Sequence, residues 1–240
     1  MADRKYDVSI GLGVIDKASS KLGNVMNAFA KFGLAVNGVQ QAYRAIAGPI
    51  SEVTKLAGIQ ERAELTLAQA MQQAGTFTEK AFKHNLEYAS SLQRMTTYGD
   101  EAILGVQKML TNFGVEGEML DSLTKSTLDL AAAKGMDLRA AADLVSKSVG
   151  SSTNALTRYG IEVTGAVGST ERMQTAVDNI TKLFGGAAQA NAQTYAGRVA
   201  QLQNRWGDFV EKIGFAVIPI LEKLIEIINN NVLPVFEAWI

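Results

Sequence analysis

Apolar residues recur at alternating steps of three and four along the first part of the chain, from Leu22 to Ala57. A repeat that averages 3.5 residues is typical of a helix that packs along a helical partner in a coiled coil. The pattern predicts one long helix over residues 16–58, with Asp16 as its N-cap. The expected helix-helix seam in this segment consists of Leu22, Val25, Phe29, Phe32, Val36, Val39, Tyr43 and Ile46.

A second interpretation of the same segment is an ordinary amphipathic helix that covers the core of a neighbouring domain. Few charged residues flank the apolar row, although charged pairs usually select coiled-coil partners. Before this helix, Tyr6, Val8 and Ile10 alternate with polar residues, which predicts a short strand or extended arm over residues 1–15.

Residues 59–184 repeat a different pattern, in which a capping residue precedes an apolar run of helical period and a glycine follows it. Expected N-caps are Thr78, Asp100, Asp137 and Ser169 or Thr170. This order predicts a compact domain of several helices joined by short loops. The glycines expected to end the helices are Gly75, Gly114, Gly135, Gly150 and Gly185.

Residues 185–240 predict another long helix and the start of a further helical region. The passage from Ala187 to Gln193 reads either as a flexible joint or as the first turns of that helix, and Pro219 and Pro234 are each expected to start a new segment. The pattern stops at Ile240 without a cap, so we expect a longer parent protein. The helix carries apolar residues at steps of three and four, and its expected seam positions are Val199, Leu202, Trp206, Phe209 and Ile213.

The composition favours an all-α fold with long N- and C-terminal amphipathic helices around a multi-helix domain. Hydrophobic residues make up 47% of the chain and aromatic residues only 7%, which suits closely packed helices, and there are only 3 prolines. A net charge of −1 argues against a nucleic-acid surface built on positive charge. The lack of cysteine excludes a disulfide framework and a cysteine nucleophile in the sequence given.

No group of residues predicts a catalytic, cofactor or metal site, and we expect the chain not to be an enzyme. His84 is the single histidine, and one histidine cannot build a zinc site or a catalytic triad without other ligands or partners. Acidic pairs suggest a glycosidase, but we expect them on solvated helix faces. These pairs are Asp121 with Asp129, and Glu116 with Glu118.

Three stretches in the second half of the chain resemble the tail tape measure proteins of long-tailed bacteriophages and prophages. They are Ala155 to Ile161, Phe184 to Ala188, and Gln201 to Phe209 followed by Ile213-Gly214 and Pro219 to Leu221. Their order and spacing carry the resemblance. It is weaker over residues 1–58, and between Ile59 and Gly150 only the general character of the family is present.

The resemblance implies a structural protein that scaffolds the tail tube, sets its length and leaves the tail ahead of the DNA during genome ejection. It also implies location in the lumen of the virion tail tube, and in the bacterial cytoplasm during assembly. The implied partners are further copies of the chain, tail tube proteins, tail tip or baseplate proteins and tail assembly chaperones. No specific nucleic acid is implied.

A second function remains open for the C-terminal part. The amphipathic run from Ile213 to Ile240 could act on a host membrane or envelope by lying in the bilayer interface.

Overall fold

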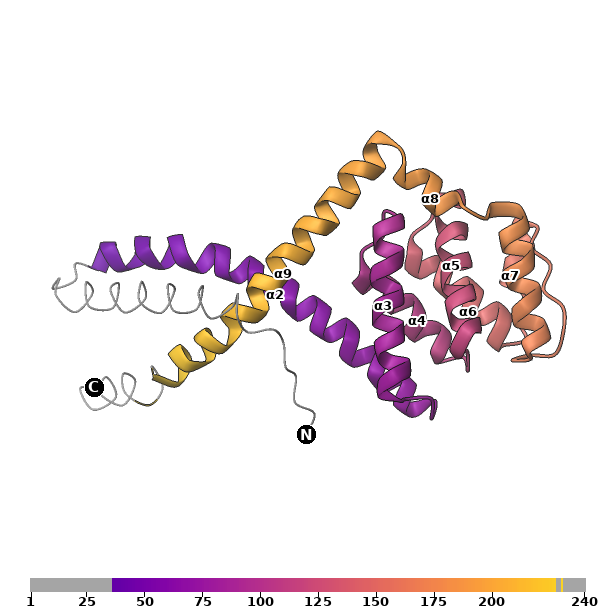
Figure 1. Ribbon diagram of the computed structural model, residues 1–240, viewed down its shortest axis with the longest axis horizontal. Helices are drawn as coiled ribbons and strands as arrows, with labels where there is room; N and C mark the ends of the chain where they lie inside the picture. The colour runs from indigo at the N-terminus through magenta and orange to yellow at the C-terminus, as the bar shows by residue number, and fades with distance from the viewer. Residues whose placement is uncertain (1–35, 228–229, 231–240) are drawn as a thin grey trace. The chain divides into compact units, whose positions relative to one another are not determined.

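The computed structural model describes residues 36–227 and residue 230 (Figure 1). These residues form helices joined by turns and contain no strand, which confirms the expected all-α fold. The expected N-terminal strand lies outside the described residues. So do four of the expected seam residues, Leu22, Val25, Phe29 and Phe32.

The chain divides into two compact units, Met1–Ala57 with Phe209–Ile240, and Gly58–Asp208. In the first unit the structure describes parts of two long helices, α2 (Val36–Gln73) and α9 (Tyr195–Ile227). The backbone differs from expectation at two positions. α2 does not end at Gly58, since a glycine inside a helix only weakens it by about 1 kcal/mol. Pro219 lies within α9 and does not start a new helix.

The second unit is a multi-helix domain whose elements are joined by short turns, apart from a longer loop over residues 160–169 (Figure 1). After the end of α2 come α3 (Glu79–Met95), α4 (Asp100–Thr111), α5 (Gly117–Lys134), α6 (Leu138–Gly150), the 3₁₀ turn η1 (Ala155–Tyr159), α7 (Thr170–Phe184) and α8 (Ala187–Ala192).

Helix α5 is the central element of this domain, because it packs against α3, α4, α6, α7 and α8. Half of its residues are buried, among them Leu123, Leu128 and Leu130, which have no exposed surface. Helices α4 and α6 add Ile103, Leu110, Val145 and other fully buried residues to the same core. Burial of such side chains stabilises the fold by about 1.5–3 kcal/mol each.

Local capping rules hold at three of the four helix starts of the domain for which the sequence predicted a cap. The side chains of Thr78, Asp137 and Ser169 accept hydrogen bonds from the amides of Ala81, Ala140 and Arg172, as predicted. Asp100 is an exception: it is the first residue of α4, and Gly99 is the N-cap. The backbone amide of Asp100 donates instead to Oε1 of Gln93 on α3.

Arg172 on α7 is a buried cation that holds the connection between α6 and α7. Its guanidinium donates to the backbone oxygens of Ser148 at 2.7 Å, Gly165 at 3.1 Å and Ser151 at 3.4 Å. The carbonyls at the end of α6 carry partial negative charge, which suits this contact. The loop from residue 151 to residue 169 is therefore tied to the helix that follows it.

The sequence left two alternatives for residues 187–193, a flexible joint or the first turns of the long C-terminal helix, and the structure shows neither. The passage is a separate helix with Ala188 and Ala192 buried, and α9 begins only after a turn at Gln193 and Thr194. Its first turn is held by Asp129 of α5, whose Oδ1 accepts a hydrogen bond from the Ala188 amide at 3.0 Å. Asp129 is 4% exposed, so the expectation of a solvated helix face was wrong for this residue.

Gly197 allows α8 and α9 to meet in a tight corner. A Cβ atom at this position would collide with the backbone of Asn191 and Ala192. Any other residue there would require the two helices to move apart.

Candidate functional site

Two surfaces of the described residues are candidate functional sites, and the first was predicted. We define the α9 apolar row as Tyr195, Val199, Leu202, Trp206, Phe209 and Ile213. Within the domain of residues 58–208, Tyr195 is 87% exposed, Val199 38%, Leu202 66% and Trp206 64%. In the other unit, Phe209 is 53% and Ile213 is 40% exposed. The structure therefore places this half of the predicted seam on an accessible surface.

The opposite face of the first half of α9 explains why the apolar row is turned outward. Gln201 Nε2 donates to the backbone oxygens of Arg94 and Thr96, and Asn204 Nδ2 donates to that of Thr97. Positions 201, 204 and 208 lie two residues after 199, 202 and 206. At about 100° per residue, the two sets lie on opposite helix faces. A polar face thus attaches this part of α9 to the turn between α3 and α4.

Asp208 also attaches α9 to the domain, and its carboxylate, like that of Glu101, lies near the carboxylate of Asp100. The Gln93 amide, which is buried, donates to both carboxylate oxygens of Asp208, at 2.9 and 2.8 Å. Burial raises the pKa of Asp100 to about 6, and the nearby carboxylates of Glu101 and Asp208 contribute to this shift in the same direction. Asp100 therefore binds a proton more readily than an isolated carboxylate does.

The remaining seam residues, Val36, Val39, Tyr43 and Ile46, lie on the helical backbone of α2. Their packing against a partner stays a prediction. Among the residues that the structure describes, no helix is long and apolar enough to cross a membrane.

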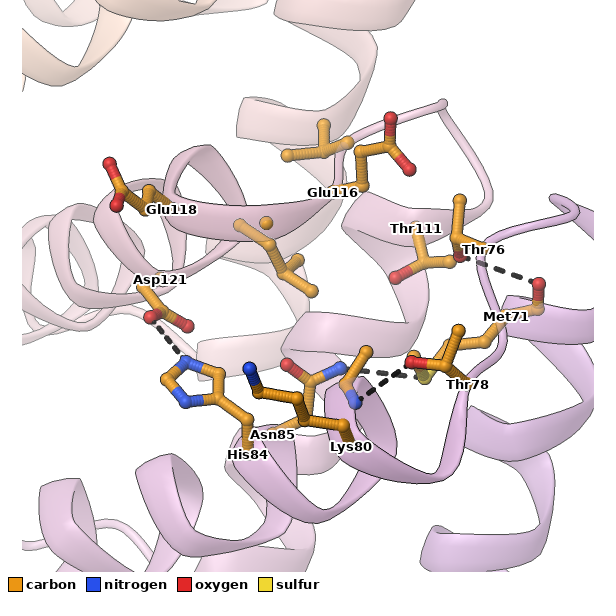
Figure 2. A pocket seen from close by; sticks show the side chains of 14 residues that line it. Met71, Thr76, Thr78, Lys80, His84, Asn85, Thr111, Glu116, Glu118 and Asp121 are labelled. Atoms are coloured by element: carbon orange, nitrogen blue, oxygen red, sulfur yellow. Dashed lines mark hydrogen bonds and ion pairs between the residues drawn. The ribbon is translucent and has the colours of Figure 1, made fainter.

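The second surface is a pocket of about 640 Å³ between the end of α2, α3, the end of α4 and the start of α5 (Figure 2). We call it the Thr111 pocket. Its polar lining consists of Thr76, Thr78, Lys80, His84, Asn85, Thr111, Glu116, Glu118 and Asp121, and its apolar lining includes Met71, Ala81, Val115 and Leu120. A volume of this size is typical of small-ligand sites.

His84 and Asp121 connect α3 and α5 at one side of this pocket. His84 Nε2 lies 2.7 Å from Asp121 Oδ2. Next to this pair, the Tyr88 hydroxyl donates to the backbone oxygen of Asp121. Burial raises the pKa of Tyr88 to about 12, with smaller contributions from Asp121 and Asp129, so Tyr88 keeps its proton as a donor.

Asn85 in the lining of this pocket is a buried polar residue. Asn85 Nδ2 contacts the Met71 sulfur at 3.4 Å, and Gln107 Nε2 donates to the backbone oxygen of Asn85. Two residues that line the pocket each have a buried oxygen without a hydrogen-bond partner within the described residues, namely Thr111 Oγ1 and Asp121 Oδ1.

Sequence reasoning missed the Thr111 pocket because its walls come from four separate elements. Thr111, Asn85 and Asp121 are ordinary polar positions in three different helical repeats, and no local motif joins them. Glu116 and Glu118 are exposed, as the sequence predicted.

No group of three His, Cys, Asp or Glu residues that could hold a metal ion occurs in the described part of the chain. No family model, curated protein or solved structure matches this chain.

Proposed function

We propose that this chain is a structural assembly protein of the tape measure type in a bacteriophage or prophage tail. The observation that carries the proposal is the α9 apolar row, which is exposed at Val199 and Leu202 on a 33-residue helix. Exposed rows of this kind mark surfaces for partner proteins. Residues Gln201 to Phe209 on the same helix resemble tail tape measure proteins, and this resemblance is the reason for proposing a phage tail as the assembly.

In this proposal the α9 apolar row packs against other copies of the chain or against tail components. Domain 58–208 holds the start of α9 by its polar face, and Val199 and Leu202 are exposed on the opposite face for such packing. Helices suit a measuring role, because each residue advances the chain by about 1.5 Å. The tail tube, the tail tip or baseplate and the assembly chaperones are the proposed partners.

The test is made on tails purified from an induced culture of a bacterium whose prophage encodes this chain. Mass spectrometry should detect peptides of this chain in the tails. Insertion of a second copy of residues 195–227 should lengthen the tails by about 50 Å in electron micrographs. Tails that carry Gln203→Ala alone serve as the control of unchanged length.

Two results would count against the proposal. If the tails contain no peptides of this chain, the chain is not a part of the tail. If the tails contain the chain but keep their length after the insertion, residues 195–227 do not set tail length, although the chain can still act in assembly.

A membrane-interface role is the second candidate, and the aromatic residues in the α9 apolar row favour it. Trp206 and Phe209 are of the kinds that gather at membrane surfaces, and both are more than half exposed. Co-sedimentation with vesicles of mixed neutral and anionic lipids separates the two functions. Under the tail proposal the purified chain should stay in the supernatant.

A further inference from the structure

We propose that the Thr111 pocket is a binding site for a ligand that carries an ammonium or guanidinium group. The inference is independent of a role in a tail. It depends on two buried oxygen atoms of its lining residues, the balance of charge around the pocket and its size.

The buried Thr111 hydroxyl is the first reason. Thr111 is the last residue of α4 and is 2% exposed, yet its Oγ1 has no hydrogen-bond partner within the described residues. Figure 2 shows this hydroxyl directed into the pocket. A buried oxygen left without a partner costs about 1–3 kcal/mol of stability. A ligand that donates a hydrogen bond to Thr111 would recover that energy.

The second reason is the state of Asp121 on the facing side of the pocket. Its Oδ2 is occupied by His84, whereas its Oδ1 is buried and has no partner among the described residues. An ionised carboxylate can only accept hydrogen bonds. A ligand that donates a hydrogen bond would satisfy Oδ1 of Asp121, and a charged donor makes the stronger bond.

The charged residues in the lining indicate that the ligand carries a positive charge. Glu116, Glu118 and Asp121 contribute carboxylates to the lining, whereas Lys80 contributes the only lysine or arginine among the described residues of the lining. His84 already contacts one of these carboxylates. Lys80 is exposed and forms no ion pair with a described residue, so its flexible side chain can move away when another cation enters.

The apolar lining defines the rest of the ligand. Met71, Val115 and Leu120 can pack against the methylene groups of an alkyl chain while its charged end reaches Asp121 and Thr111. A volume of about 640 Å³ accepts a free alkyl amine or a basic side chain on a short peptide segment. Both sources share the same chemistry.

The test is a titration followed by amide chemical shifts of the full chain, with three probes. They are n-butylammonium, N-acetyl-lysine methylamide and N-acetyl-norleucine methylamide, a neutral analogue that keeps the four side-chain carbons of lysine and lacks its ammonium group. Both amines should shift the amides around Thr111, Glu118 and Asp121, and the neutral analogue should not. Tighter binding of the lysine derivative identifies a peptide as the source, and equal binding identifies a free amine.

Four variants test the roles of the residues. Thr111→Val should weaken amine binding by about tenfold, since one buried hydrogen bond to a cation is lost, while thermal stability stays equal or rises. Thr111→Ser keeps the hydroxyl and should restore binding. Glu118→Gln should weaken it by about two- to fivefold, and Lys80→Met should strengthen it by a similar factor.

Several results would overturn the proposal. They are equal binding of the neutral analogue, the absence of shifts around the pocket, or weaker binding after Lys80→Met, which would indicate an anion site. Glu118 and Lys80 are exposed, so their variants remain informative even if a change at Thr111 impairs folding.

Discussion

The side-chain amide of Gln93 on α3 donates hydrogen bonds to both carboxylate oxygens of Asp208, which lies 115 residues later on α9. The oxygen of the same amide accepts a hydrogen bond from the backbone of Asp100. One buried side chain thus joins three helices and decides how the start of α9 sits on the domain.

Replacing Gln93 with alanine should loosen the first half of α9. The change leaves the Asp208 carboxylate and the Asp100 amide without their partner, so we expect a loss of about 1–3 kcal/mol in the free energy of unfolding. Hydrogen exchange of residues 195–208 should become faster than in the native chain. Gln203→Ala, at an exposed position on α9, is the control, and equal exchange in both variants would contradict the prediction.

Asp100 should make the domain more stable in mild acid than at neutral pH. Its pKa in the folded state is raised from 3.8 to about 6, mainly by burial. Between these values the folded state binds more protons than the unfolded state. This stabilising contribution is complete below about pH 4 and is lost as the pH rises through 6.

Asp100→Asn should remove this dependence. At pH 7 we expect a gain of about 1–2 kcal/mol, a value reduced for the partial exposure of the side chain. The new amide can also donate to Gln60 Oε1, which is buried and has no partner in the described residues. Urea unfolding at pH 4 and pH 7 measures the effect, and an unchanged difference in stability between the two pH values would refute it.

Arg172→Met should destabilise the domain by about 2–4 kcal/mol, because three backbone oxygens lose a charged donor. Arg172→Lys should restore only part of this loss, since an ammonium cannot reach three carbonyls in the geometry of a guanidinium. Thermal unfolding provides the measurement. The exposed Arg139 gives the control Arg139→Met, and a similar small effect at both positions would show that the contacts of Arg172 contribute little.

Leu202→Asp should weaken self-association by about tenfold or more and leave the melting temperature unchanged, because the side chain is 66% exposed in the single chain. Light scattering during size-exclusion chromatography measures the mass across a range of concentrations. Gln203→Asp adds the same charge one residue away and should have no effect. A chain that stays monomeric at every concentration would mean that the α9 apolar row does not bind another copy.

Features that depend on neighbours in sequence were predictable. Thr78, Asp137 and Ser169 cap their helices because the donor lies three residues later in each case. The all-α fold followed from the repeated order of cap, apolar run and glycine. The exposed positions of Leu202 and Val199 are consistent with the predicted seam, which has a regular helical period and no packing partner in the core of the domain.

Features that depend on distant residues were not predictable. The sequence predicts Asp129 on a solvated helix face, but its carboxylate accepts a hydrogen bond from the Ala188 amide, 59 residues later. The sequence predicts Asp100 as an N-cap, but its backbone amide donates a hydrogen bond to the side chain of Gln93. The Thr111 pocket needs four elements in place before its unpartnered oxygens become visible.

The close approach at Gly197 has a consequence for how this protein can change over time. At this corner the backbone atoms of Asn191 and Ala192 leave no room for a Cβ atom on residue 197. Exposed side chains of both helices can therefore change during evolution while the corner keeps its geometry, and in homologous chains position 197 should tolerate only glycine.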